Sequence, residues 1–147
     1  GPFSPDRCGG LPSRQLVKLC YSGKYTEAEM LTHLMGNGGM FAYLGTRDLR
    51  EVEAREAAGD KEAEHVFKAM AYQIAKEIGA MATVLAGAVD NIVITGGMAW
   101  SKRLVDDLSK RVRFIAPILV MPGEEELPAL AAGALRVLRG EEVAQTY

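Results

Sequence analysis

The sequence predicts an α/β fold: a helix-rich chain with a short parallel βαβ unit and an incomplete sheet. Two apolar runs, at 89–95 and 114–120, are too short for helices of their own and are typical of buried strands. A helical pattern at 101–112 separates them, and this order is that of a parallel βαβ unit. Because only two strands are predicted, we expect the sheet to have an open edge.

Length and composition indicate one ordinary globular domain. The chain has 147 residues, of which 48% are hydrophobic and 24% charged, enough to build a core. The net charge of -2 and the pI near 5.7 disfavour a nucleic-acid partner or an anionic membrane surface. The sequence shows neither a membrane-spanning run nor the pattern of a signal peptide. We therefore expect a cytoplasmic protein whose partners are small molecules or other proteins.

The first part of the chain predicts a loop followed by two short helices. Residues 1–12 contain three prolines and no hydrophobic period, so they should form a loop. A helix is expected over 13–22. Thr26 and Glu29 then form a capping box for a helix that ends near residue 36.

The next segment predicts a turn, an extended stretch and another helix. Residues 37–39 are rich in glycine and should make the turn. Residues 40–44 are expected to form a short strand or an extended loop. Gly45 and Thr46 can cap a helix that runs to about residue 58.

The longest predicted helix opens at Gly59 and Asp60. Behind it, apolar side chains recur at steps of three and four residues over about seven turns. This spacing indicates a long helix with one face toward the core. The apolar positions are Val66, Phe67, Met70, Ile74, Ile78, Met81 and Leu85.

A pair of glycines stands between the first predicted strand and the next helix. Gly96 and Gly97 let the backbone approach a ligand closely, and the N-terminus of the helix from Ser101 offers free N–H groups. This arrangement favours a nucleotide site, with a tight turn that binds nothing as the alternative. The P-loop pattern GxxxxGK[ST] and the dinucleotide fingerprint GxGxxG are both absent.

The second predicted strand leads into an acidic cluster. Ligands of parallel sheets lie beyond the carboxyl ends of the strands, and these ends fall at 95–99 and 121–126. We therefore expect the glycine pair and the acidic cluster to lie side by side. A final helix is expected from about 124 to 139.

At the level of whole motifs, the chain resembles a known family. The blocks that carry the resemblance are GPFSPDRCGGLP, LVKLCYSGKYTEAEM, YLGTRDLREVE, AYQIAKEIGAMATVL, VDNIVITGGMAWS and FIAPILVMPGEEELPALAAGALRVLRGEE. Together they span essentially the whole chain. They are similar to the C-terminal part of the butyrate kinases, in the acetate and butyrate kinase family of the actin-like ATPase superfamily. Branched-chain fatty acid kinases look nearly the same, whereas acetate kinases are less similar.

The resemblance implies a fold, an activity and a domain organisation. The fold would be the helix-rich part of an actin-like ATPase (ribonuclease H-like) domain. The activity would be reversible transfer of the γ-phosphoryl group from ATP to a short-chain carboxylate, giving butanoyl phosphate and ADP, with Mg²⁺. Residues 1–147 would be the C-terminal portion of the nucleotide-binding domain, with the N-terminal domain and the first strands of this domain absent. We expect this chain alone to be inactive, to hold ATP weakly and to form homo-oligomers through its open sheet.

Four residues in the first half match family positions around ATP. Arg7, in PDRCGG, matches the arginine that the family places against the transferring phosphoryl group, where a guanidinium offers two donors and stays charged. Asp48 and Arg50 match an Asp-x-Arg that holds adenosine in the related acetate kinases, with Leu49 as an apolar contact. The alternatives are a solvated surface arginine at the first site and a first-turn acid beside a surface base at the second.

The glycine turn matches the adenosine motif of the superfamily. Its residues Gly96, Gly97, Met98 and Ala99 would lie close under the nucleotide. Trp100 stands where the resemblance implies His or Tyr, and it either flanks the adenine pocket or covers the helix entry.

The acidic cluster matches the family position near Mg²⁺. Glu125 is the best match, with Glu124 and Glu126 as alternatives in register. Because Mg²⁺ keeps several waters, one carboxylate acting through water is sufficient. Three glutamates at a helix start are also what the helix dipole alone favours.

Two other functions stay open on the sequence. A non-catalytic actin-like module that binds nucleotide or assembles would need a complete sheet within this chain. A sugar or glycerol kinase half is the other alternative, but the YSGKYTEAEM and FIAPILVMPGEEE blocks do not resemble those enzymes.

Overall fold

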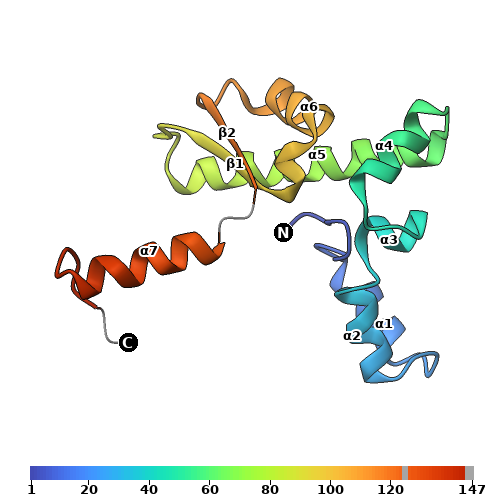
Figure 1. Ribbon diagram of the computed structural model, residues 1–147. Coiled ribbons are helices and arrows are strands. Elements are labelled where there is room, and N and C mark those ends of the chain that lie inside the picture. The colour runs from blue at the N-terminus through green and yellow to red at the C-terminus, as the bar shows by residue number, and fades with distance from the viewer. Residues whose placement is uncertain (124–125, 145–147) are drawn as a thin grey trace.

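The computed structural model describes residues 1–123 and 126–144, and these form helices and one small sheet (Figure 1). The helices are α1 (Ser13–Cys20), α2 (Glu27–Leu34), α3 (Gly39–Leu44), α4 (Leu49–Ala57), α5 (Lys61–Val84), α6 (Lys102–Val112) and α7 (Glu126–Leu138). The strands are β1 (Ile92–Gly96) and β2 (Ile118–Pro122), and a short 3-10 helix, Gly97–Trp100, follows β1.

The two strands pair in parallel, as predicted for the βαβ unit. Ile92 lies opposite Ile118, and the register continues to Gly96 opposite Pro122. Both strands begin later than predicted, because turns occupy the residues before them. Ile115 still donates its N–H to the carbonyl of Val112 at 2.9 Å, closing the end of α6.

Helix α5 is the centre of the fold, and α3, α4 and α6 pack against it (Figure 1). Phe67 and Met70 are fully buried on its predicted apolar face, and Val66 is nearly so. The stripe does not stay buried to its end, since Met81 and Leu85 are 52% and 55% exposed. Most of the remaining core side chains come from α3, α4, α6 and β1, and include Met40, Val52, Leu104, Leu108, Val112 and Ile92. Phe3 of the N-terminal loop and Ala116, before β2, complete the core.

The prediction of an extended segment at 40–44 is wrong, because these residues belong to α3. The first N–H groups of this short helix find acceptors in the N-terminal loop: Met40 donates to the carbonyl of Ser4 at 3.0 Å, and Phe41 donates to that of Pro5 at 2.9 Å. Gly39, at the start of α3, has a positive φ of 59°. The loop therefore packs on a helix start that has no side chain to keep it away.

Side-chain caps begin most of the longer helices. The predicted capping box of Thr26 and Glu29 is confirmed, and Asp60 caps α5 by accepting from two backbone N–H groups. The predicted cap of α4 at Thr46 is wrong, because Asp48 caps that helix through the N–H of Arg50. Thr46 instead donates its hydroxyl to Glu51 at 2.7 Å.

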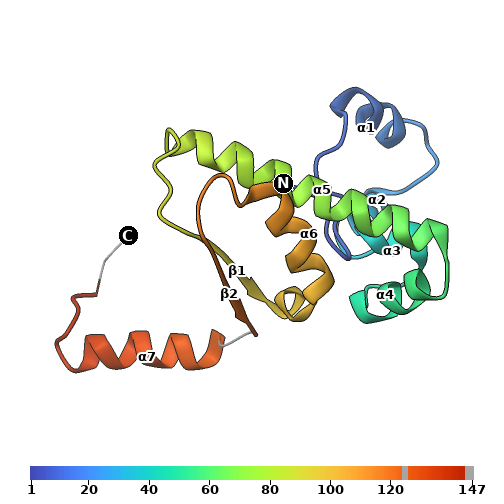
Figure 2. The ribbon, with the colours of Figure 1, turned by 90° about the horizontal axis from the view of Figure 1, so that it is seen from above.

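One face of the sheet and most of α7 from Leu127 onward are uncovered. Ile92 packs into the core, whereas Val93 and Leu119 point to the opposite face and are 53% and 48% exposed. Helix α7 stands apart from the other elements in both views (Figures 1 and 2).

In the described part of the chain, none of the helices combines the length and apolar character that crossing a membrane requires.

Candidate nucleotide site

One cavity of about 830 Å³ brings together three segments that are far apart in the sequence. The N-terminal loop forms one wall, the start of α4 forms the second, and the turn after β1 forms the third. Among the lining residues are Arg7, Arg47, Asp48, Leu49, Arg50, Glu53, Thr95, Gly96, Gly97, Met98, Trp100 and Ser101. Seven of the residues predicted to bind ATP therefore border a single hollow.

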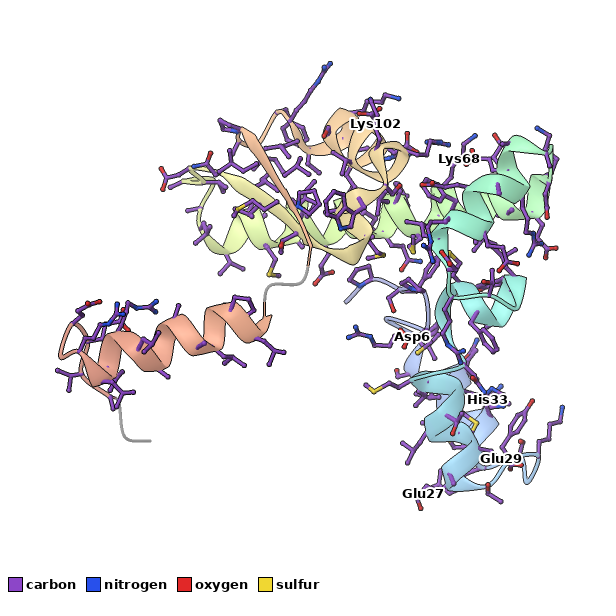
Figure 3. The ribbon with its side chains drawn as sticks, viewed as in Figure 1. Asp6, Glu27, Glu29, His33, Lys68 and Lys102 are labelled. Carbon is purple, nitrogen blue, oxygen red and sulfur yellow. The ribbon has the colours of Figure 1, made fainter. Side chains whose placement is uncertain are left out.

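The loop that carries Arg7 is held on both sides. Ser4 Oγ accepts the N–H of Arg7 at 3.1 Å, and Cys8 donates its N–H to the carbonyl of Leu34 at 3.1 Å. Figure 3 shows the neighbouring Asp6 beside the upper end of α2. Arg7 Nε lies 3.7 Å from Asp6 Oδ1, and the arginine side chain is 64% exposed. A guanidinium with so few protein partners keeps donors available to an anionic ligand.

Asp48 and Arg50 form a two-pronged ion pair at the start of α4. Arg50 Nη2 lies 2.6 Å from Asp48 Oδ2, and Arg50 Nε donates to Asp48 Oδ1 at 2.9 Å. The side-chain and backbone hydrogen bonds from Arg50 lower the pKa of Asp48 to about 2. Asp48 is therefore ionised at neutral pH, and it holds the guanidinium plane against the start of the helix.

The turn after β1 is built on two glycines, as its sequence suggests. Gly96 has φ 82° and ψ -179°, a conformation that favours glycine. Its carbonyl accepts the N–H of Gly123 at 3.2 Å, so the ends of β1 and β2 lie side by side. Met98 borders the cavity, whereas Ala99 is buried, only 4% exposed, and is not among its lining residues.

The predicted Mg²⁺ residue cannot be placed. Glu125 and its neighbour Glu124 lie outside the described residues, and the side chain of Glu126 is likewise not described. Within 1–123 and 126–144, no group of three or more histidine, cysteine, aspartate or glutamate side chains is placed to hold a metal ion.

The N-terminus of α6 differs from the free helix end expected from the sequence. A 3-10 helix that begins at Gly97 separates it from β1, and Ser101 caps it by accepting the N–H of Leu104 at 2.9 Å. The same Ser101 hydroxyl donates to Glu53 of α4. Glu53 and Ser101 are 48 positions apart, and no sequence motif links them.

Two further lining residues flank the cavity. The single tryptophan of the chain, Trp100, is 72% exposed and borders it. Arg47 donates through Nη2 to Asn37 Oδ1 at 2.7 Å, and its guanidinium lies 4.0 Å from the centre of the Phe41 ring. Arg47 is therefore fixed against α3, unlike Arg7.

Solved structures define the class to which this fold belongs. The chain superposes on acetate kinase of Porphyromonas gingivalis with a TM-score of 0.83 and 21% identity, over 94% of this chain and 41% of that one. Acetate kinase of Entamoeba histolytica gives a TM-score of 0.79 and 17% identity, over 92% of this chain and 42% of that one. The chain therefore has the fold of part of an acetate kinase.

Sequence comparison narrows this class to a family. The chain belongs to the acetokinase family, whose pattern it matches over residues 6–115. It is 58% identical to "Probable butyrate kinase 2" of Caldanaerobacter subterraneus subsp. tengcongensis and 54% identical to "Probable butyrate kinase" of Clostridium botulinum, over all 147 residues. These matches cover 42% and 41% of the relatives, so the chain spans about two fifths of their length.

Proposed function

We propose that this chain is the C-terminal part of a longer kinase that transfers phosphate between ATP and butyrate or a similar short-chain carboxylate. The main support is the single cavity that gathers Arg7, the Asp48–Arg50 pair and the glycine turn. The names of the similar proteins, butyrate kinases, agree with it. A cytoplasmic location is consistent with this activity.

The charges around the cavity suggest how the nucleotide lies in it. Glu53 places a carboxylate beside the N-terminus of α6, where it opposes the binding of a phosphate. Arg7, on the loop wall, favours a phosphate through its free donors. The phosphates would therefore point toward Arg7, with the nucleoside between Arg50 and the glycine turn.

The proposed roles follow from what phosphoryl transfer requires. The protein must position the two substrates and stabilise the negative charge on the transferring group. Arg7 would supply positive charge there, and Asp48 would keep the Arg50 plane in place against the nucleoside. Mg²⁺ would neutralise phosphate charge when bound with the nucleotide, and Glu125 is the proposed residue near it.

Replacing Arg7 in the longer protein tests this proposal. We expect Arg7→Ala to lower kcat for butyrate-dependent ADP formation about 100-fold or more, because a transition-state charge partner is lost. Arg14→Ala, which removes an exposed arginine of α1 outside the cavity, is the matched control and should keep the wild-type rate. A coupled assay for ADP measures both. A wild-type protein that consumes no ATP with any short-chain carboxylate would contradict the function, and full activity of Arg7→Ala would contradict the role of that residue.

A further inference from the structure

Two polar links join α4 to α6, and only one of them borders the cavity. The first is the hydrogen bond from Ser101 Oγ to Glu53 Oε1, and both residues line the cavity. The second is the ion pair of Arg103 Nη2 with Glu56 Oε1 at 2.7 Å, and neither of its residues lines the cavity. The two links connect the same helices, so they can be compared directly.

The first link lies between the two walls proposed to hold the nucleoside. Glu53 is on α4, just beyond the Asp48–Arg50 pair that starts this helix. Ser101 directly follows the Gly97–Trp100 turn and caps α6. Any change in the distance between these two residues would therefore change the width of the nucleoside end of the cavity.

The chemistry of the Ser101–Glu53 link makes it well suited to fixing the distance between these two residues. Ser101 uses its acceptor for the N–H of Leu104, at 2.9 Å, and its donor for Glu53. Both residues are half-buried, so water competes less for the hydrogen bond than at an open surface. The carboxylate also lies beside the N-terminal end of α6, which Ser101 caps.

We infer that Glu53 is a positioning residue for nucleotide binding: by holding Ser101, it fixes the spacing between the Asp48–Arg50 wall and the glycine-turn wall. This inference rests on the proposed function. Glu53 need not touch the nucleotide itself. Its loss would loosen nucleoside contacts that are the same in the ground state and the transition state, so KM for ATP should change and kcat should not.

Four variants of the longer protein test the inference through KM and kcat for ATP. Glu53→Ala removes the acceptor and should raise KM about tenfold, with kcat within about twofold of wild type. Glu53→Gln keeps an oxygen for Ser101 and should restore a KM near the wild-type value. Ser101→Gly removes the donor while keeping an acceptable cap, so it should raise KM as Glu53→Ala does. Glu56→Gln weakens the second link and should lower the melting temperature without raising KM.

The outcomes separate this inference from the proposed function. An unchanged KM in both Glu53→Ala and Ser101→Gly overturns it. An equal rise of KM in Glu56→Gln also overturns it, because the effect would then be general loosening of the helices. If the wild-type protein phosphorylates no carboxylate, the proposed function fails, and the same variants are compared by the Kd for ATP from calorimetry. In that measurement the Glu53→Ala and Ser101→Gly values must still rise about tenfold over wild type.

Discussion

Asp48 is held in its ionised form by the residue two positions further along the chain. Its pKa falls from 3.8 to about 2, chiefly through the side-chain hydrogen bond from Arg50 and next through the Arg50 backbone N–H. A carboxyl whose pKa is lower in the folded state stabilises the fold above the unfolded value of 3.8. This contribution is lost as the pH falls through about 2. At neutral pH the pair is therefore fully formed.

Removing the Arg50 side chain should raise the pKa of Asp48 part of the way back to its ordinary value. In Arg50→Ala we expect the pKa of Asp48 to rise toward 3.8 without reaching it, because the backbone N–H at position 50 still donates. Carboxyl carbon NMR over the acidic range in which the chain stays folded follows this titration. Asp106, whose pKa is lowered by Lys102, is the internal control and should not move. An Asp48 titration identical in the two proteins would show that the pair does not set its charge state.

The residues of the candidate site could be predicted from the sequence only where they belong to a recognisable local motif. Arg7, the Asp48–Arg50 pair and the glycine turn stand in recognisable motifs, and all of them border one cavity. Glu53 has no such signal, because its role depends on a contact across the fold with Ser101. Long-range contacts of this kind become visible only once the helices are packed.

At the scale of elements, local chemistry predicted helix starts better than it predicted element type. The capping box at Thr26 and the helix start at Asp60 are correct, because each cap uses backbone groups two or three residues away. Helix α3 was missed, since its first N–H groups bond to carbonyls of the N-terminal loop, more than thirty positions earlier. Neither hydrophobic period nor propensity contains that information.

Because α3 contacts the N-terminal loop at Gly39, this glycine is the one near the site at which an added side chain would be most destabilising. A Cβ at Gly39 would meet the carbonyl of Ser4 and lie 2.6 Å from that of Arg7, and the φ of +59° would strain it further. We expect Gly39→Ala to lower the free energy of unfolding by about 3 kcal/mol, from strain and overpacking together. Urea unfolding measures this cost.

Gly45 provides the matched control at the other end of the same helix. It has a similar φ of +71°, but a Cβ there meets nothing within 4 Å. Gly45→Ala should therefore cost about 1 kcal/mol, the price of backbone strain alone. Equal losses of stability in the two variants would show that the loop, and with it Arg7, is not held by this close approach.

At the scale of the whole molecule, the described sheet leaves one of its faces uncovered. It has one parallel pair of strands, and α5 and α6 pack against only one of its faces. Helix α7 also exposes apolar residues, among them Leu127, Leu130 and Leu138. The relatives are more than twice as long as this chain, and we propose that their additional part covers these surfaces. The sequence predicted the open edge from its strand count, whereas the position of α7 away from the core had no local signal.

These uncovered surfaces should make the 147-residue chain self-associate. Val93, Leu119 and Met121 form a continuous apolar face, with exposed fractions of 53%, 48% and 62%. Leu119→Lys places a charge in this face and should reduce the average mass measured by light scattering at micromolar concentration. Tyr21→Lys makes the same change at an exposed residue after α1 and should leave the mass unchanged. In the longer protein, where we propose that the face is buried, Leu119→Lys should instead lower stability. A wild-type chain that stays monomeric at these concentrations would show that the open sheet does not drive association.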